Sequence, residues 1–276
     1  MNGKLTIVGT PIGNLGDISP RVAEALRSAD VILCEDTRHS LQLLNHLDIK
    51  GPRLVSLHEH NESGRTAQVL DMLREGQSIA LVSDAGLPLV SDPGTRLVPA
   101  VIEAGFDVET VNGPTAALHA LLLSGMNTSR FAFEGFLPRS GRERAERLQA
   151  LAIKKRTAII YESPQRLAKT INDLAGTEQG ERRIAICREL TKLHEEVWRG
   201  TLAEAADYLD QTPPRGEYTL VLEGVAATPI EVSDVVIIEA LQAELALGSS
   251  KRDAVAAVAT SLALPRDRVY KLSITL

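Results

Sequence analysis

Short apolar runs alternate with segments in which apolar residues recur every three or four positions, and this pattern fills the first half of the chain. A strand, an amphipathic helix and a second strand together form the repeating unit of a parallel sheet. The short runs predict strands at residues 5–8, 31–34, 54–57, 79–82 and 108–111. We therefore expect residues 1–113 to form an α/β domain with a mostly parallel sheet.

Helix starts are indicated where a capping residue stands directly before a proline. The side chain of the first residue accepts a hydrogen bond from a free N–H of the first turn, and proline fits the first helical position. Three pairs with Ser or Asp before the proline are Ser19-Pro20, Asp92-Pro93 and Ser163-Pro164. We expect a helix to begin at each of them.

In the second half of the chain, fewer helical segments separate the predicted strands. An apolar helix over 115–123 leads into a second α/β domain at 114–226, in which only two clear helices separate the strands, so a mixed sheet is expected. The predicted strands of this domain are 131–136, 158–161, 184–187, 195–199 and 218–223. Residues 227–276 form a helical C-terminal extension, with helices predicted at 237–247, 252–262 and 265–271.

Composition narrows the classes of protein that need consideration. The chain is 44% hydrophobic and 24% charged, which is typical of a folded globular protein. Aromatic residues make up only 3%, which argues against a protein that stacks the bases of single strands on aromatic side chains. Because the net charge is −6, an RNA partner has to be bound by a local basic surface.

Neither a metal nor a membrane is predicted. Cys34 and Cys187 each end an apolar run, as buried reduced thiols do, and two isolated cysteines cannot form a zinc site alone. His58 and His60 flank Glu59 and resemble half of a metal site, but successive residues at a strand end point to opposite faces, which makes joint binding of one metal ion awkward.

No membrane segment is predicted either. The N-terminus lacks a signal-peptide core, and no apolar run approaches the ~20 residues of a membrane span. We expect a cytoplasmic protein.

Common ligand-binding motifs are absent, and polar loops after the strands take their place. The chain has no G-x-G-x-x-G, no P-loop, no H-E-x-x-H and no C-x-x-C, which excludes the usual dinucleotide, nucleotide and zinc signatures. Ligands of open α/β sheets bind at the carboxyl ends of the strands. Loops rich in glycine, aspartate and proline follow the predicted strands there, at 9–17, 34–40, 58–62, 81–94 and 112–118. Asp84 and Asp92 are candidate hydrogen-bond acceptors for an amine or a ribose.

These loops carry a specific ordered set of motifs: GTPIGNLGD, EDTR, HEHNE, SDAG, SDPG, EGFLPR, YESPQRL and RELTK. In this order they resemble the ribosomal small-subunit RNA cytidine-2′-O-methyltransferases of the tetrapyrrole-methylase superfamily. The resemblance runs from Gly3 to about Gly224, and SSKRDAVAAVA resembles the C-terminal helical extension of that family. The chain departs from the family pattern at Leu87, where Thr is usual, and at Asn112, where Pro is usual.

The resemblance implies a fold, a cofactor and partners. It implies two α/β domains of the tetrapyrrole-methylase type with S-adenosylmethionine bound in the cleft between them, a homodimer, and an assembled small ribosomal subunit and its RNA as substrate. By motif position, the residues implied to contact the cofactor are Pro11, Asp84, Ala85, Gly86, Ser91, Asp92, Gly94, Pro114, Thr115, Ala116, Phe136, Tyr161, Glu162, Glu217 and Tyr218.

Methyl transfer to a ribose 2′-hydroxyl requires a general base or close alignment, because the hydroxyl is a poor nucleophile near neutral pH. The candidate catalytic residues are Asp36, Arg38, Glu189 and Lys192, in two of the loops. A lysine whose pKa is lowered by burial can accept a proton, so Lys192 or Asp36 is the expected base, with Arg38 as a phosphate clamp. Glu189 is an alternative base, or orients the lysine. A structural ion-pair network is the other interpretation of these residues.

The expected RNA-binding surface lies in the second domain. Seven basic residues stand between positions 139 and 156, opposed only by Glu143 and Glu146 within that range. They follow the EGFLPR motif, which is expected beside the cleft, and we predict phosphate contacts from Arg139, Arg142, Arg144 and Arg147. A solvated helix face is the alternative.

Three other functions fit the same fold. One is a tetrapyrrole (precorrin-type) C-methyltransferase, which needs a wide apolar cleft and no basic strip. Another is a methyltransferase for a modified protein side chain. The third is a non-catalytic ribosome-assembly factor that binds the cofactor without turnover.

Overall fold

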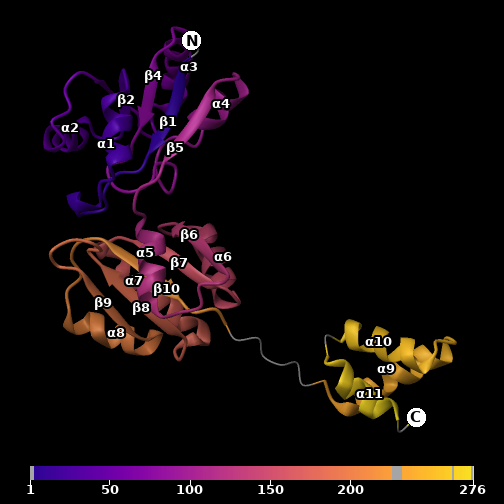
Figure 1. The fold of residues 1–276 in the computed structure, drawn as a ribbon. Helices are drawn as coiled ribbons and strands as arrows, with labels where there is room; N and C mark the ends of the chain where they lie inside the picture. Colours follow the sequence, from indigo (N-terminus) through magenta and orange to yellow (C-terminus); the bar gives the residue numbers. More distant parts are fainter. Residues whose placement is uncertain (1–2, 226–231, 263, 275) are drawn as a thin grey trace. The chain divides into compact units, whose positions relative to one another are not determined.

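The computed structural model describes residues 3–225, 232–262, 264–274 and 276. The chain divides into two units, Met1–Val225 and Ala226–Leu276 (Figure 1). The predicted boundary at residues 226 and 227 lies outside the described residues. The first unit contains two five-stranded sheets, and the second unit contains helices.

The first sheet is entirely parallel, as the alternating pattern predicted. Its strands are β1 (Lys4–Val8), β2 (Val31–Cys34), β3 (Arg53–Ser56), β4 (Ser78–Leu81) and β5 (Asp107–Val111). Their spatial order is β3-β2-β4-β1-β5. Because all five strands run in one direction, the loops that follow them lie at one edge of the sheet.

Helices cover both faces of the first sheet, so the strands are apolar on both sides. On one face, α3 (Glu62–Arg74) and α4 (Leu97–Glu103) pack on Leu5, Leu33 and Leu81. On the other face, α1 (Pro20–Arg27) and α2 (Thr37–His46) pack on Val8, Ile32 and Ala80. A single 3-10 turn, η1 (Leu15–Asp17), interrupts the loop after β1.

Two of the three predicted helix starts are confirmed. Ser19 accepts a hydrogen bond from the Val22 amide and Pro20 is the first residue of α1, while α7 (Pro164–Leu174) begins at Pro164. The start at Asp92 is wrong, because α4 begins at Leu97. Two residues after Asp92, Gly94 has a φ of +116°, which no helix contains.

A distant side chain caps α4 instead. Oε1 of Glu62 accepts hydrogen bonds from the backbone N–H groups of Arg96 at 2.8 Å and Leu97 at 2.9 Å. Glu62 is the first residue of α3, and its side chain is buried. A carboxylate that satisfies two free amides of a helix start stabilises it as a local cap does. The start signal for α4 is therefore tertiary.

The second sheet is mixed, as predicted. Its strands are β6 (Phe131–Phe136), β7 (Thr157–Glu162), β8 (Arg183–Arg188), β9 (Glu196–Thr201) and β10 (Tyr218–Leu222), in the order β6-β7-β10-β8-β9. Only β6 and β7 pair in parallel, and the other neighbours are antiparallel. A register shift between Phe133 and Gly135 interrupts the pairing of the edge strand β6.

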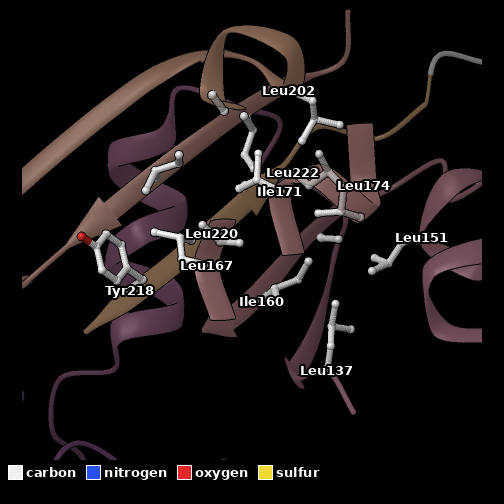
Figure 2. Packing of buried hydrophobic residues seen from close by; sticks show 14 of the residues in the cluster. Leu137, Leu151, Ile160, Leu167, Ile171, Leu174, Leu202, Tyr218, Leu220 and Leu222 are labelled. Carbon is white, nitrogen blue, oxygen red and sulfur yellow. The ribbon is translucent and has the colours of Figure 1, made fainter. Parts of the chain in front are cut away.

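The two faces of the second sheet are covered unequally. The single helix α5 (Ala116–Ser124), which connects the two sheets, packs on Ile159, Ala185 and Val221. Three helices cover the other face around the cluster in Figure 2: α6 (Gly141–Ala152), α7 and α8 (Leu202–Gln211). Helix α7 continues into a π-helical turn, η2 (Ala175–Gln179). The sequence prediction of two helices missed α8, although Thr201 and Glu204 form a capping box at its start.

The C-terminal unit consists of the three predicted helices. They are α9 (Asp234–Ala246), α10 (Lys251–Ser261) and α11 (Arg266–Ser273). Ser233 and Ser250 cap the first two, and a small core forms around Ile237, Leu241 and Val258. Among the helices of the described ranges, none has the length and apolar character needed to cross a bilayer.

Candidate functional site

Close backbone contacts hold three of the loops at the edge of the first sheet together. The amide of Thr10 donates to the carbonyl of Gly86 at 2.8 Å, and the Gly86 amide donates back at 3.2 Å. Gly9 lies so close to Gly113 that a Cβ on Gly9 would stand 2.5 Å from the Gly113 nitrogen. Only glycine permits this approach, so the loops after β1, β4 and β5 form one rigid wall.

A cavity of about 300 Å³, the inter-sheet cleft, lies between this wall and the second sheet. Its size and its mixed apolar and polar lining are typical of a small-molecule site. Eleven of the fifteen residues expected at the cofactor line it: Ala85, Gly86, Ser91, Asp92, Thr115, Ala116, Phe136, Tyr161, Glu162, Glu217 and Tyr218. Motif position thus predicted most of one continuous surface.

The other four predicted residues lie nearby. Pro11 and Asp84 line a second, adjoining hollow. Pro114 places its carbonyl oxygen 3.5 Å from where a Cβ of Gly86 would stand. Gly94 is buried behind the loop, against Leu81, and shapes the loop. None of these four is among the residues that line the inter-sheet cleft.

The sequence prediction missed most of the apolar wall of the cleft. Ile12, Val90 and Leu190 line it, together with Ser163, Pro164, Cys187 and Thr219. Except for Thr219, these residues stand inside or beside the quoted motifs, but nothing in their residue type distinguishes them from core residues. Leu87, which departs from the family pattern, lines the cleft, whereas Asn112 does not.

Asp92 is the carboxyl group of the cleft whose titration is most perturbed. Burial raises the pKa of Asp92 to about 6, the hydrogen bond from Ser83 opposes the rise, and the nearby Glu35 and Asp84 add to it. A carboxylate held in this way is destabilised as long as no cation or hydrogen-bond donor faces it. The site therefore favours a ligand that brings a positive charge or hydroxyl groups to Asp92.

The Glu162 side chain, by contrast, is fully buried and is not accessible to a ligand. Its side chain accepts from the Ser163 amide at 2.8 Å and from the Thr170 hydroxyl at 2.6 Å, and it pairs with Arg166 at 3.2 Å. Its contribution to the cleft is the placement of backbone.

Tyr161 forms an aromatic side of the cleft. Its hydroxyl accepts a hydrogen bond from the Ala117 amide at 3.2 Å, at the start of α5. Phe133 and Phe136 meet its ring edge-on, at centroid distances of 4.9 and 5.6 Å. Burial raises the pKa of Tyr161, so the phenol stays neutral near pH 7.

The adjoining hollow, which we call the polar hollow, shares Ile12, Ala85 and Glu217 with the inter-sheet cleft. The two spaces therefore meet. The remaining lining of the polar hollow is mostly polar and comes from both sheets: Thr10, Pro11, Gly13, Leu15, His39, Ser40, Gln42, Leu43, Ser83, Asp84 and Lys192.

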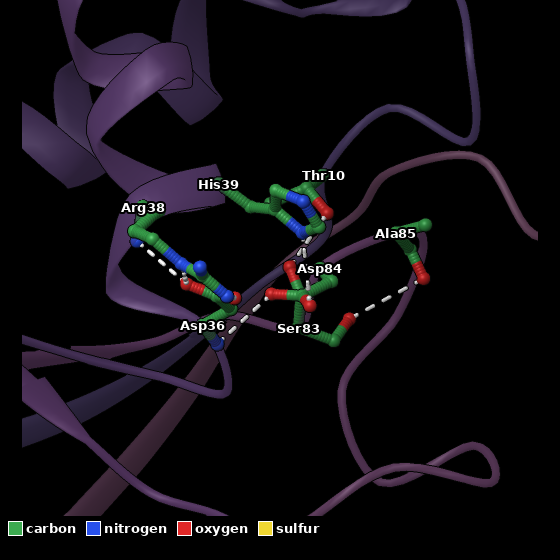
Figure 3. A network of polar contacts seen from close by, with 7 residues as sticks. All are labelled: Thr10, Asp36, Arg38, His39, Ser83, Asp84 and Ala85. Atoms are coloured by element: carbon green, nitrogen blue, oxygen red, sulfur yellow. Dashed lines mark hydrogen bonds and ion pairs between the residues drawn. The ribbon is translucent and has the colours of Figure 1, made fainter.

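The first predicted catalytic pair, Asp36 and Arg38, lies beside this hollow (Figure 3). Asp36 caps α2, and its carboxylate accepts from the Arg38 amide at 2.8 Å and from the guanidinium at 2.6 Å. These hydrogen bonds hold the pKa of Asp36 well below its usual range. The carboxylate is therefore a weak proton acceptor. The Arg38 side chain is 85% exposed, which leaves it accessible to a phosphate.

The second predicted pair, Glu189 and Lys192, forms an ion-pair cluster with Glu217. The Lys192 ammonium donates to Glu189 at 2.9 Å and to Glu217 at 3.0 Å. Burial lowers the pKa of Lys192, but the two carboxylates raise it more, so the net shift is upward. The lowered lysine pKa expected from the sequence is therefore wrong, and Lys192 is a stable cation.

The basic strip is only partly available to RNA. Arg139 and Arg142 are exposed, and Arg142 pairs only with Glu146 one turn away. Arg144 is 4% exposed, and its guanidinium bonds to Asp173, Thr170 and the Pro138 carbonyl. A guanidinium so enclosed cannot reach a phosphate, so the expected contact from Arg144 is corrected to a structural role.

Arg147 is also paired. It donates to the backbone and the carboxylate of Glu134, and Lys154 donates to the same carboxylate at 2.6 Å. Glu134 precedes the strip in sequence, so a charge count over the strip alone did not include it. The exposed basic surface that remains is formed by Arg139, Arg142, Lys155 and Arg156.

Comparison with known proteins identifies the family to which this chain is similar. The family description Tetrapyrrole (Corrin/Porphyrin) Methylases matches residues 4–206. The chain is 46% identical to ribosomal RNA small subunit methyltransferase I of Synechocystis sp., over 99% of this chain and 98% of that protein. It is 42% identical to the protein of the same name from Halalkalibacterium halodurans, over 98% and 94%.

Solved structures share the fold at lower identity. The methyltransferase CobJ has a TM-score of 0.63 at 20% identity, covering 81% of this chain and 95% of that one. The uroporphyrin-III C-methyltransferase of Thermus thermophilus, complexed with S-adenosylhomocysteine, has a TM-score of 0.59 at 18% identity, covering 80% and 97%. These likenesses establish the two-sheet fold of the first unit.

Proposed function

Because this chain belongs to the tetrapyrrole methylase family, and within it to the ribosomal RNA small subunit methyltransferase I proteins, we propose that it transfers methyl groups from S-adenosylmethionine to small-subunit ribosomal RNA. The observation that carries this proposal is identity above 40% over nearly the full length of both chains. The matched region spans 99% and 98% of this chain, so it includes the cleft loops, the basic strip and the C-terminal helices.

The inter-sheet cleft fits S-adenosylmethionine chemically. Leu87, Val90 and Leu190 offer an apolar surface for a base, and Asp92 offers a carboxylate for the ribose hydroxyls or a positive group. Tyr161 presents an aromatic ring, which favours a nearby cation. When bound, the cofactor supplies an electrophilic methyl group on a positively charged sulfur.

The residues of the chain then have three tasks. The rigid wall built by Gly9, Thr10, Gly86 and Gly113 fixes where the cofactor meets the polar hollow. The apolar wall excludes water from the cleft, which strengthens the interactions of Asp92. Arg38, at the polar hollow, is placed to hold a phosphate of the acceptor strand.

We further propose that the acceptor atom is the 2′ oxygen of a cytidine ribose, and that the substrate is the assembled small subunit. The acceptor atom and the substrate are both implied by the motif resemblance. Many residues of those motifs line the inter-sheet cleft and the polar hollow. A polar hollow that joins a cofactor cleft is suited to a ribose and its phosphates rather than to a wide apolar macrocycle. An acidic chain with a few exposed basic residues, among them Arg139, Arg142, Lys155 and Arg156, also suits a ribosomal particle, which offers protein and shape besides phosphate. The place of action is then the cytoplasm.

The alternative functions are less well supported. Tetrapyrrole methyltransferases share the fold at 24% identity or less, which carries no statement about substrate. A diphthine synthase shares it at 16%, which likewise carries no statement about substrate. The identity to the ribosomal RNA enzymes is nearly twice as high, and that match spans 99% of this chain, against 81% for CobJ.

The proposal is tested by offering labelled S-adenosylmethionine with three acceptors in parallel: unmethylated small subunits, naked ribosomal RNA and a tetrapyrrole precursor. We expect label in the subunit and much less in naked RNA. Label in the tetrapyrrole would instead identify a C-methyltransferase. Tight cofactor binding with no label in any acceptor would identify an assembly factor.

We also propose that the working unit is a homodimer formed around α5 and β6. Leu118 and Leu122 of α5 are exposed, and so are Phe131 and Phe133 of β6. Phe133 packs against Tyr161 on the sheet face that α5 covers, so these side chains share one side of the sheet. An edge strand beside an apolar helix surface is a place where a second copy can pair and bury both.

A further inference from the structure

We propose that His39 is the general base that accepts the proton of the acceptor hydroxyl, and that Asp84 is the positioning residue that orients its imidazole. This inference rests on the proposed function and adds a residue to which the motifs assign no role. It explains how the acceptor is activated when neither Asp36 nor Lys192 is suited to take a proton.

The contacts of His39 fix the orientation of its ring. His39 stands in the first turn of α2, and its Nδ1 lies 3.1 Å from Oδ2 of Asp84. The other oxygen of Asp84 accepts from the Asp36 amide, also at 3.1 Å, so the carboxylate is held at both ends (Figure 3). A carboxylate can only accept, which assigns the proton to Nδ1 and leaves Nε2 with a free lone pair. Within the described ranges, Nε2 has no hydrogen-bond partner.

His39 and Asp84 lie where a general base for the acceptor hydroxyl is needed. His39 and Asp84 both line the polar hollow, which joins the inter-sheet cleft at Ile12, Ala85 and Glu217. An acceptor in the hollow therefore lies next to a methyl donor in the cleft. The His39 side chain is 60% exposed, so an RNA strand can reach it. Histidine held by a carboxylate is a common arrangement for a general base.

The other charged groups around the hollow are already engaged. Asp36 is bound by Arg38, while Lys192 is bound by Glu189 and Glu217. Glu35 is near Asp84, and burial raises its pKa, but it does not line the hollow. Two carboxylates also line the hollow: Glu217 binds the Lys192 ammonium, and Asp84 is held by His39 and the Asp36 amide. In the described lining, His39 is the group that offers an unpartnered ring nitrogen.

The step balances without any further reactant. The 2′ oxygen of the ribose forms a bond to the methyl carbon while the bond from that carbon to sulfur breaks, and its electron pair stays on sulfur. The hydroxyl proton moves to Nε2 of His39, which becomes an imidazolium stabilised by Asp84. The imidazolium then returns the proton to water.

The experiment measures single-turnover methylation of unmethylated small subunits at saturating S-adenosylmethionine for His39→Gln, His39→Ala and the control His46→Gln, an exposed histidine at the far end of the same helix. Loss of a general base slows a reaction by about 10²- to 10⁴-fold. We expect that loss for both His39 variants and less than a twofold change for His46→Gln. Calorimetric cofactor affinity and subunit binding should stay within about threefold of wild type, since histidine bases act on the reaction and not on binding.

Two further readouts separate a base from a structural residue. The wild-type rate should fall as the pH is lowered, and this fall should disappear in His39→Gln. Added imidazole should restore part of the lost rate of His39→Ala. It should leave the rate of His46→Gln unchanged. Asp84→Asn should slow the reaction and alter the pH profile, because an amide can donate to Nδ1 and so stabilise the other tautomer.

Retention of the wild-type rate by His39→Gln would overturn the inference and leave the proposed function standing. A slow His39→Ala variant that imidazole does not rescue, with an unchanged pH profile, would also overturn it. If the wild-type chain itself methylates no small subunit, the proposed function fails and the inference falls with it.

Discussion

Asp92 and Glu162 are both acidic residues of the inter-sheet cleft, yet their surroundings give them opposite roles. Glu162 is fully hydrogen-bonded by Ser163, Thr170 and Arg166, so its charge is compensated inside the protein. Asp92 is half-buried near other acids, and its pKa is raised to about 6. The compensated acid stabilises the fold, whereas the uncompensated one weakens the free protein and is available to a ligand.

The sign of this effect makes Asp92 testable through stability. With a pKa raised from 3.8 to about 6, the folded state holds its proton more tightly than the unfolded state does. Stability is therefore lost as the pH rises from about 4 to about 6, by at most about 3 kcal/mol at 1.36 kcal/mol per pKa unit. Above pH 6 the penalty stays. Asp92→Asn should raise the free energy of unfolding at pH 8 and leave it nearly unchanged at pH 4.

The measurement is denaturant unfolding of the ligand-free chain at the two pH values, with cofactor affinity measured in parallel. We expect the stabilised variant to bind S-adenosylmethionine at least tenfold more weakly, as is common when a strained functional group is relieved. Equal stability of variant and wild type at pH 8 would contradict this role of Asp92.

At the scale of elements, the structure shows how a helix can begin far from its sequence signal. Asp92 and Pro93 have the residue types of a helix start, but α4 begins at Leu97, where Glu62 of α3 accepts two backbone hydrogen bonds. The loop between is bent by Gly94 so that it can line the cleft. The loop that lines the cleft thus displaces the helix start, and a distant carboxylate supplies the cap.

Removing this cap should destabilise the first unit. Glu62→Ala leaves two amides without their acceptor, which costs about 1–3 kcal/mol when a buried partner is removed. Glu62→Gln keeps an acceptor oxygen and should lose about half as much, since charge-assisted bonds are roughly twice as strong. Unfolding by urea measures both, with Glu59→Ala, at an exposed position nearby, as control. A Glu62→Ala variant as stable as Glu59→Ala would contradict the cap.

The fold was predictable from the sequence to the extent that local signals decide it. Alternating apolar runs located all ten strands to within a residue or two, because buried strands carry the signal in themselves. The start of α4 and the burial of Arg144 were not predictable, because both depend on partners distant in sequence, Glu62 and Asp173. For the same reason the ordered motifs located the cleft, whereas the pairing that raises the pKa of Lys192 required the structure.

At the scale of the whole molecule, an excess of acidic residues coexists with a few exposed basic side chains near the second sheet. The chain carries a net charge of −6, and the exposed basic surface of the second sheet is formed by Arg139, Arg142, Lys155 and Arg156. The apparent strip of seven basic residues is reduced by pairs to Asp173 and Glu134. RNA binding should therefore depend on few residues.

Replacing Arg139 and Arg142 together with glutamine should weaken binding of small subunits and reduce its dependence on salt. Removal of one phosphate contact reduces the steepness of log K against log salt by about 0.7–0.9. We expect a decrease of about 1.4–1.8 in the double variant, and none when the exposed Arg27 and Lys50 are replaced instead. An unchanged slope in the Arg139 and Arg142 variant would contradict an RNA-binding role for this surface.

The proposed dimer is tested by a charge at the exposed apolar surface. Leu122 and Ile153 are both 76% exposed, but Leu122 lies on α5 and Ile153 follows α6 on the opposite face of the sheet. Light scattering at micromolar concentration should give a dimer for wild type and Ile153→Glu, and a monomer for Leu122→Glu, since a buried unpaired charge is strongly unfavourable. A dimer that tolerates Leu122→Glu would place the interface elsewhere.

The central claim is that the chain methylates a ribose of small-subunit RNA, and the most direct measurement is to locate the methyl group. Unmethylated small subunits are incubated with the chain and S-adenosylmethionine, and the RNA is digested to nucleosides and identified by mass spectrometry. We predict one new 2′-O-methylcytidine per subunit. A methyl group on a base, on a ribosomal protein or nowhere in the particle would contradict the claim.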